Sequence, residues 1–182
     1  APDVDRGYTP RLWQLLNDEN NAPEVARLLA YHLVGVNDLA ELQRLLHRFP
    51  EEEHPWARFY LGYLALRRGL YGRADELFSR RPDPGGYPVE PWVWEGNGAM
   101  AALYTGSFRR ALENVRRAQE LLIGERPGEL PRMHGTLLGL EAEALRLSGN
   151  RSEALRVARR AVELAPESSS AQLVLRNLER SR

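Results

Sequence analysis

Apolar residues along most of the chain recur every three or four positions, which is the spacing of an amphipathic α-helix. Short breaks rich in Gly, Pro, Asn and Ser separate these stretches, and no stretch has the period of two that is typical of a half-buried strand. The pattern predicts an all-α fold. Eight of the expected helices form pairs, 22–34 with 37–49, 55–68 with 71–80, 91–105 with 107–123, and 131–148 with 150–165, and flanking helices are expected at 9–18 and 167–181.

The four helix pairs share a turn sequence. A Gly lies between the paired helices and an Ala follows five residues later: Gly35 with Ala40, Gly69 with Ala74, Gly106 with Ala111, and Gly149 with Ala154. The four glycines are 34, 37 and 43 residues apart. A hairpin repeated in this way predicts a solenoid, in which each unit buries its apolar face against its neighbours. We expect one domain over residues 1–182, with repeats at about 21–50, 55–81, 91–123 and 131–165 and a closing helix at 167–181.

The predicted helix starts carry their own signals. Three prolines fall where the first turn of a helix tolerates them: Pro23, Pro55 and Pro91. Three residues are expected to act as N-caps: Thr9, Ser107 and Asn150. The extra residues between repeats, near 80–91 and 124–131, are expected to be spacers, with a loop at the ligand face as the alternative.

The repeated positions resemble the tetratricopeptide repeat over about residues 21–166. The second unit matches through Leu61, Gly62, Gly69, Tyr71, Ala74 and Phe78, the third through Ala99, Gly106, Phe108, Ala111, Val115 and Ala118, and the fourth through Gly149, Ala154, Ala158, Ala161 and Pro166. The first unit departs from the pattern, with Arg44 and His47 at packing positions, and only the fourth keeps the closing Pro. The resemblance implies a right-handed solenoid of four hairpins that binds other proteins.

The resemblance also implies a concave groove lined by the first helix of each unit. The groove residues that we expect are Trp56, Phe59, Tyr63, Arg67, Asn97, Met100, Tyr104, Glu143 and Arg146. The first unit would add Ala22, Val25, Leu29, His32 and Leu33. Aromatic side chains with a polar end suit the capture of a peptide, Asn97 would pair with a backbone amide, and Arg67 or Arg146 would hold a carboxylate. The alternatives are that some of these aromatics pack against a neighbouring helix or that a terminal helix fills the groove.

One subgroup of this family clamps the C-terminal carboxylate of chaperones with Lys, Asn and Arg. Here Val25 and Leu29 stand where a basic residue and Asn would be, and the chain has no Lys. We therefore expect an apolar or mixed peptide, or a helix of a partner protein, in place of a chaperone tail.

Composition removes several classes of function. The chain has no Cys, 25 Lys plus Arg, and 25 Asp plus Glu, so thiol chemistry is excluded and a general attraction to polyanions is not expected. All the basic residues are Arg, which we attribute to the codon bias of a GC-rich, bacterial genome. Residues 1–54 carry a net charge of −5 and residues 135–182 a net charge of +2, which leaves head-to-tail self-association open.

No apolar run approaches the roughly 20 residues that a membrane span needs, and residues 1–20 do not follow the plan of a signal peptide. Because the sequence starts at Ala1, the removal of a leader, a tag or a longer N-terminal part stays open. The cytoplasm is favoured slightly over the periplasm.

Candidate chemistry is sparse. The four histidines, at positions 32, 47, 54 and 134, do not show the spacing of metal ligands on one helix face, and we expect no metal and no cofactor. Gly96-Asn97-Gly98 lacks the strand and the Lys of a phosphate-binding loop, and Ser168-Ser169-Ser170 is typical of a helix start. We predict a protein-interaction module that is not an enzyme. The alternatives are a self-association or regulatory domain of a larger protein and, less favoured, RNA binding through the arginine pairs at 109–110, 116–117 and 159–160.

Overall fold

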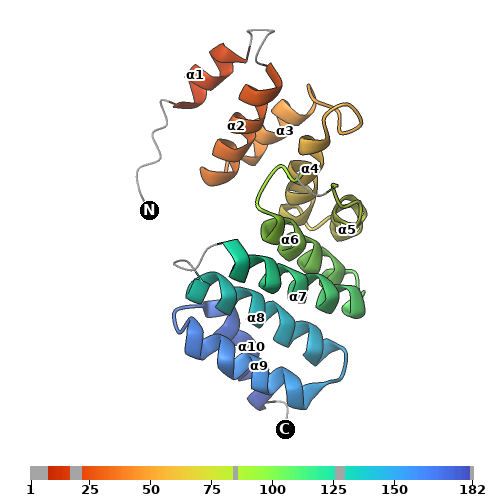
Figure 1. The fold of residues 1–182 in the computed structure, drawn as a ribbon, viewed down its shortest axis with the longest axis vertical. Coiled ribbons are helices and arrows are strands. Elements are labelled where there is room, and N and C mark those ends of the chain that lie inside the picture. Colours follow the sequence, from red (N-terminus) through yellow and green to blue (C-terminus); the bar gives the residue numbers. More distant parts are fainter. Residues whose placement is uncertain (1–7, 17–21, 84–85, 126–129, 181–182) are drawn as a thin grey trace. The chain divides into compact units, whose positions relative to one another are not determined.

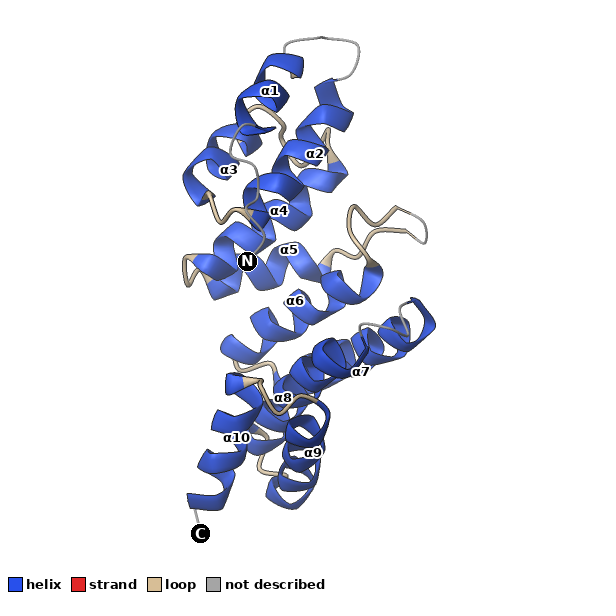
Figure 2. Cartoon of the chain, turned by 90° about the vertical axis from the view of Figure 1, so that its left-hand side faces the viewer, coloured by secondary structure: helices blue, strands red, loops and turns tan. Residues whose placement is uncertain are grey.

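The computed structural model describes residues 8–16, 22–83, 86–125 and 130–180, and across these ranges it contains ten helices and no strand (Figures 1 and 2). The first five are α1 (Tyr8–Leu15), α2 (Ala22–Gly35), α3 (Leu39–Leu46), α4 (Pro55–Arg67) and α5 (Tyr71–Ser79). The second five are α6 (Pro91–Tyr104), α7 (Phe108–Glu125), α8 (Leu130–Leu147), α9 (Arg151–Leu164) and α10 (Ser169–Arg180). The all-α prediction is confirmed. Residues 17, 18 and 181 of the expected flanking helices lie outside the described ranges.

The helices form two compact units, residues 1–88 with α1–α5 and residues 89–182 with α6–α10. In the first unit α2 pairs with α3 and α4 with α5, and in the second α6 pairs with α7 and α8 with α9. These four hairpins are the predicted repeats. In the second unit α10 packs against α8 and α9, as Figure 2 shows for the C-terminal end of the chain.

Every hairpin turns through one residue in the left-handed conformation. These residues are Asn37, Gly69, Gly106 and Gly149, with φ between 58° and 86°. In each turn the left-handed residue donates its N–H to a carbonyl three residues back, and the next residue donates to a carbonyl five residues back, as Gly69 and Leu70 do to Leu66 and Ala65. This pairing satisfies the last carbonyls of the preceding helix. One backbone motif therefore closes the first helix of all four repeats.

The first repeat turns at Asn37, and the predicted turn at Gly35 is wrong. Gly35 is the last residue of α2, and Asn37 takes the left-handed conformation that only Gly, Asn and Asp adopt readily. Counting from Asn37 places Leu42 and Leu46, both buried, at the positions that Ala74 and Phe78 occupy in the second repeat. Arg44 and His47, which break the pattern when it is counted from Gly35, are both exposed.

Two of the predicted helix starts are corrected. Helix α1 begins at Tyr8, so Thr9 lies inside the helix, where its hydroxyl Oγ1 is 3.0 Å from His32 Nε2 of α2. Asn150 does precede α9, but its side chain donates to the Glu153 carboxylate and makes no cap hydrogen bond. An N-cap that sequence reasoning did not predict is Asp38, whose carboxylate accepts the N–H of Glu41 at 3.1 Å.

Glycines let the two helices of a hairpin approach closely in the second and fourth repeats. In the first unit, a Cβ atom at Gly62 would lie 2.7 Å from Phe78 Cζ, so the glycine admits the ring of Phe78. In the second, a Cβ at Gly135 of α8 would clash with that of Ala165, directly after α9. Since side chains in cores are close-packed, these positions set the distance between the helices.

Candidate functional site

A groove of about 400 Å³ opens on the second unit, between α6, α8 and α10. Helix α6 lines it with Trp92, Val93, Gly96, Asn97, Met100, Leu103 and Tyr104, helix α8 with Thr136, Leu137, Gly139, Leu140 and Glu143, and helix α10 with Ser170, Leu173, Val174 and Asn177. All sixteen residues belong to one unit. Apolar side chains predominate, as they do in sites that bind peptides and small molecules.

The groove is hollow because two glycines face it from neighbouring helices. Gly96 of α6 and Gly139 of α8 both lie ten residues before the left-handed residue of their repeat. The second repeat has Phe59 at the equivalent position. At Gly139 an added Cβ would lie in ordinary van der Waals contact with α10, 3.5 Å from Ala171 Cα. The absence of side chains at these two positions thus leaves the groove hollow.

Three large apolar side chains of the groove are open to solvent. Met100 is 39% exposed, Tyr104 58% and Leu173 53%, and they come from α6 and α10. Large exposed apolar side chains that gather in one hollow mark sites of contact with another molecule. Met and Tyr are also enriched at the centres of protein interfaces.

Two polar side chains of the groove are held in place by their own helices. Asn97 donates its Nδ2 to the Val93 carbonyl at 2.8 Å, which directs its amide oxygen to other donors. Glu143 receives two hydrogen bonds from Arg146, at 2.7 and 2.6 Å. The Glu143 hydrogen bond also raises the pKa of the Arg146 guanidinium above its ordinary value. This guanidinium is therefore neutralised within α8, and the groove contains no cation among its lining residues.

Helix α10 forms the third wall of the groove, and none of its residues was among those predicted, although the sequence left open a terminal helix that fills the groove. Ser170, Leu173, Val174 and Asn177 follow one another at spacings of three, one and three residues, so they share one face of the helix. The buried residues of α10, Ala171 and Leu178, point to α8 and α9. The signal that could have identified these residues was the second apolar stripe of the helix, Leu173 and Val174.

Of the nine groove residues predicted from the sequence, the structure brings four into this groove, Asn97, Met100, Tyr104 and Glu143, with Arg146 bound to Glu143 beside them. The other four belong to α4 of the first unit. Phe59 is only 4% exposed, and its ring packs edge-on against Tyr60 and Phe78. Phe59 is therefore a core residue, which corrects its assignment to an open groove.

The remaining three residues of α4 are partly exposed and contact residues of the first unit. Trp56 is half-buried, 5.5 Å from the Phe49 ring and 5.9 Å from the Tyr60 ring, between ring centroids. Arg67 donates to the Tyr63 hydroxyl at 2.8 Å and lies 5.7 Å from the centre of its ring. The predicted carboxylate-holding role of Arg67 stays a prediction.

Because the first repeat turns at Asn37, different residues of α2 occupy the positions that were expected to line the groove. Leu29 and Leu33, expected in the groove, are fully buried because they pack into the core, and His32 is half-buried against α1. Counted from Asn37, the equivalent positions hold Glu24, Arg27, Tyr31, Val34 and Gly35. Arg27 and Tyr31 replace Val25 and Leu29 in the comparison with the chaperone-clamping subgroup, so a basic residue is present there and the Asn is still missing.

The arginine pairs of the alternative RNA-binding surface are largely engaged by carboxylates. Arg116 contacts Glu141 and Glu153, Arg117 contacts the buried Glu95 at 3.4 Å, Arg109 contacts Glu113 at 3.7 Å, and Arg159 contacts Glu179 at 3.9 Å. Within the described ranges, no three side chains of the types that ligate metals come together. None of the described helices combines the length and apolar character that crossing a membrane requires.

Comparison with known proteins supports the repeat. No family model and no curated protein matches the chain. Among solved structures, the chain is similar to the second TPR domain of human RPAP3, solved by NMR in complex with the HSP70 peptide SGPTIEEVD. The TM-score is 0.51 at 20% sequence identity, over 65% of this chain and 88% of that domain. Together with the four hairpins, this likeness shows that the chain has the all-α fold of a tetratricopeptide-like helical repeat.

Proposed function

We propose that this protein is a non-enzymatic interaction module that binds a peptide or helix of a partner protein in the groove between α6, α8 and α10. The observation that carries the proposal is the gathering of Met100, Tyr104 and Leu173, all exposed, around a hollow of about 400 Å³. Burial of such side chains stabilises a complex by about 25 cal/mol per Å² of apolar area removed from water.

The walls of the groove favour a preformed site. Ala171 and Leu178 pack α10 against α8 and α9, and Asn97 and Glu143 are oriented by hydrogen bonds within their own helices. A receptor that is already ordered loses little side-chain and backbone freedom on binding. A solved TPR domain that holds a peptide supports this class of function without identifying the partner.

The test begins with peptides selected from a displayed random library on the wild-type protein. Their affinity is then measured by calorimetry for wild type, for Tyr104→Ala with Leu173→Ala, and for the control Ile123→Ala with Leu147→Ala. The control pair removes exposed apolar side chains of the same unit that lie outside the groove. We expect the peptide affinity to fall about tenfold or more for the groove pair only. Truncation of a central apolar side chain costs roughly 1–2 kcal/mol of binding free energy, and about 1.4 kcal/mol is a factor of about ten in affinity.

Helical circular dichroism should be the same for all three proteins, since the substituted side chains are exposed. Equal affinity of the two double variants would refute the groove assignment. A dimer that forms with rising concentration and is abolished by the groove pair would instead favour self-association, which the sequence left open.

A further inference from the structure

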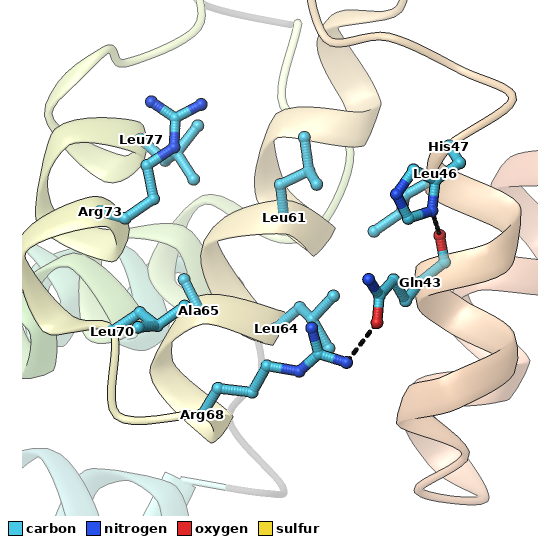
Figure 3. Close-up of a pocket in the computed structure, with 10 residues that line it drawn as sticks. All are labelled: Gln43, Leu46, His47, Leu61, Leu64, Ala65, Arg68, Leu70, Arg73 and Leu77. Atoms are coloured by element: carbon cyan, nitrogen blue, oxygen red, sulfur yellow. Dashed lines mark hydrogen bonds between the residues drawn. The ribbon is translucent and has the colours of Figure 1, made fainter.

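A second cavity, of about 220 Å³, lies in the first unit between α3, α4 and α5. Figure 3 shows Gln43 and Leu46 of α3, and His47 directly after this helix, facing Arg73 and Leu77 of α5 across the cavity, with Leu61 and Leu64 of α4 between them. Its remaining lining residues are Ala65, Arg68 and Leu70. The floor is thus aliphatic, and every ionisable side chain of the lining is basic.

The second unit contains the equivalent place, between α7, α8 and α9. Positions can be matched by counting from the left-handed residue of each repeat. Ten residues after it, Arg116 corresponds to His47; eight residues before it, Glu141 corresponds to Leu61; and four residues after it, Glu153 corresponds to Arg73. In each unit the three helices come from two consecutive repeats.

In the second unit, ion pairs hold these three helices together. Arg116 of α7 donates to Glu141 of α8 at 2.8 Å and lies 3.7 Å from Glu153 of α9. Glu141 is buried and also accepts from Gln119 at 3.0 Å. In this unit, therefore, the carboxylates of Glu141 and Glu153 both pair with the Arg116 guanidinium of α7.

The first unit lacks both carboxylates at the matched positions. Leu61 replaces one and Arg73 replaces the other, so His47 and Arg73 are two bases with no acid of the cavity lining between them. Arg73 is bound by Glu76 and Glu51, which raise the pKa of its guanidinium, Glu76 contributing most. Arg68 donates to the neutral amide of Gln43, and within the described ranges no carboxylate lies at ion-pair distance from it.

We propose that this cavity is a second docking site, for a segment of a partner protein in which an aliphatic side chain is flanked by carboxylates. The aliphatic side chain would enter among Leu46, Leu61 and Leu64, and a carboxylate would meet Arg68 and His47, taking the part that Glu141 plays in the second unit. Cavities of about 150 Å³ already admit benzene, so this one has room for a leucine side chain. The exposed, singly bonded Arg68 supplies the charge that selects an acid.

The test uses a fluorescein-labelled peptide of leucines flanked by glutamates and measures its binding by fluorescence polarisation. Two companion peptides replace the glutamates by glutamines or the leucines by alanines. The proteins are wild type, Arg68→Gln, Leu61→Glu, the charge-matched control Arg48→Gln, and Tyr104→Ala from the other groove. Leu61→Glu introduces the acid that the second unit carries at the matched position, and Arg48 is exposed outside the cavity lining.

We expect the glutamate–leucine peptide to bind wild type at least tenfold more tightly than either companion. Arg68→Gln and Leu61→Glu should each weaken binding at least fivefold, while Arg48→Gln and Tyr104→Ala should stay within twofold of wild type. Equal binding of the glutamine peptide, equal loss in Arg48→Gln, or no binding by wild type would overturn the proposal. So would saturation of the site by a second copy of the chain, seen as a dimer that Leu61→Glu dissolves. Since Tyr104→Ala reports only on the other groove, failure here leaves the proposed function standing.

Discussion

Asn37 and Gly35 show how a single residue sets the register of a repeat. The hydrogen bonds around Asn37 match those around the turn glycines of the other three repeats, although its side chain is larger. Gly is the default residue for a left-handed turn, and for that reason the sequence pattern pointed to Gly35. Asn adopts the same conformation at a small cost because its short polar side chain bonds locally.

Substitution of the two glycines by alanine separates a helical glycine from a turn glycine. Gly35→Ala should stabilise the protein by about 0.5–1 kcal/mol, because Gly35 is helical and a Cβ there meets nothing within 4 Å. Gly69→Ala should destabilise it by about 1–2 kcal/mol, because Gly69 has φ of +72°. Urea unfolding followed by circular dichroism measures both. If Gly35→Ala instead destabilised the protein, the result would indicate that the turn lies at Gly35 and not at Asn37.

His134 should make stability depend on pH. Burial, and next the neighbouring charge of Arg160, lower its pKa below the ordinary 6.5, while Glu141 opposes them. The unfolded chain therefore takes up the proton first as the pH falls. The free energy of unfolding should decrease as pH falls below about 6.5, until the folded-state pKa is passed.

The variant His134→Gln should lose that part of the pH dependence while keeping the dependence that comes from carboxylates. Urea unfolding of both proteins at pH 8 and at pH 5.5 gives the comparison. Parallel pH profiles for wild type and His134→Gln would show that this imidazole is equally easy to protonate in both states.

Pairs of helices approach each other at glycines that lack room for a methyl group. Gly135 faces Ala165 and the Ala161 carbonyl oxygen, and the latter is backbone that cannot move aside like a flexible side chain. At Gly72 of α5, in contrast, an added methyl group would meet nothing within 4 Å. The two glycines look alike in the sequence and differ only in what the neighbouring helix places opposite them.

Gly135→Ala should destabilise the second unit by about 1–3 kcal/mol, because the added methyl forces α8 and α9 apart. Gly72→Ala should stabilise the first unit by about 0.5–1 kcal/mol through helix propensity. Chemical denaturation of both variants tests the pair. Equal small effects would mean that α8 and α9 are not held together at Gly135.

At the scale of elements, the sequence predicted the order and pairing of the helices because their apolar period and turn signals are local. Helix α3 ends at Leu46, earlier than the expected residue 49, although Phe49 is still buried in a turn that follows it. The α10 residues that line the groove were not predicted. The position of this helix depends on the packing of Ala171 and Leu178 against α8 and α9, and Ala171 is more than 30 residues from the α8 residue Leu138 in the sequence.

For the whole molecule, the fold followed from the sequence more fully than the site did. Repeat register identified Asn97, Met100, Tyr104 and Glu143 because they face outward from the first helix of a hairpin. Phe59 occupies the same register position as Gly96 and Gly139, yet its ring fills space that those glycines leave open. The position of a residue in the repeat predicts which face of the helix carries its side chain. Whether that side chain is buried in a core or exposed in a groove depends on how the neighbouring helices pack.

The central claim is that α6, α8 and α10 together form a peptide-binding groove. Its most direct test is NMR titration of the ¹⁵N-labelled protein with a peptide selected on it. We expect the largest amide shifts at Gly96, Asn97, Gly139 and Asn177, which come from all three helices. Shifts confined to α7 and α9, or to the first unit, would contradict the claim.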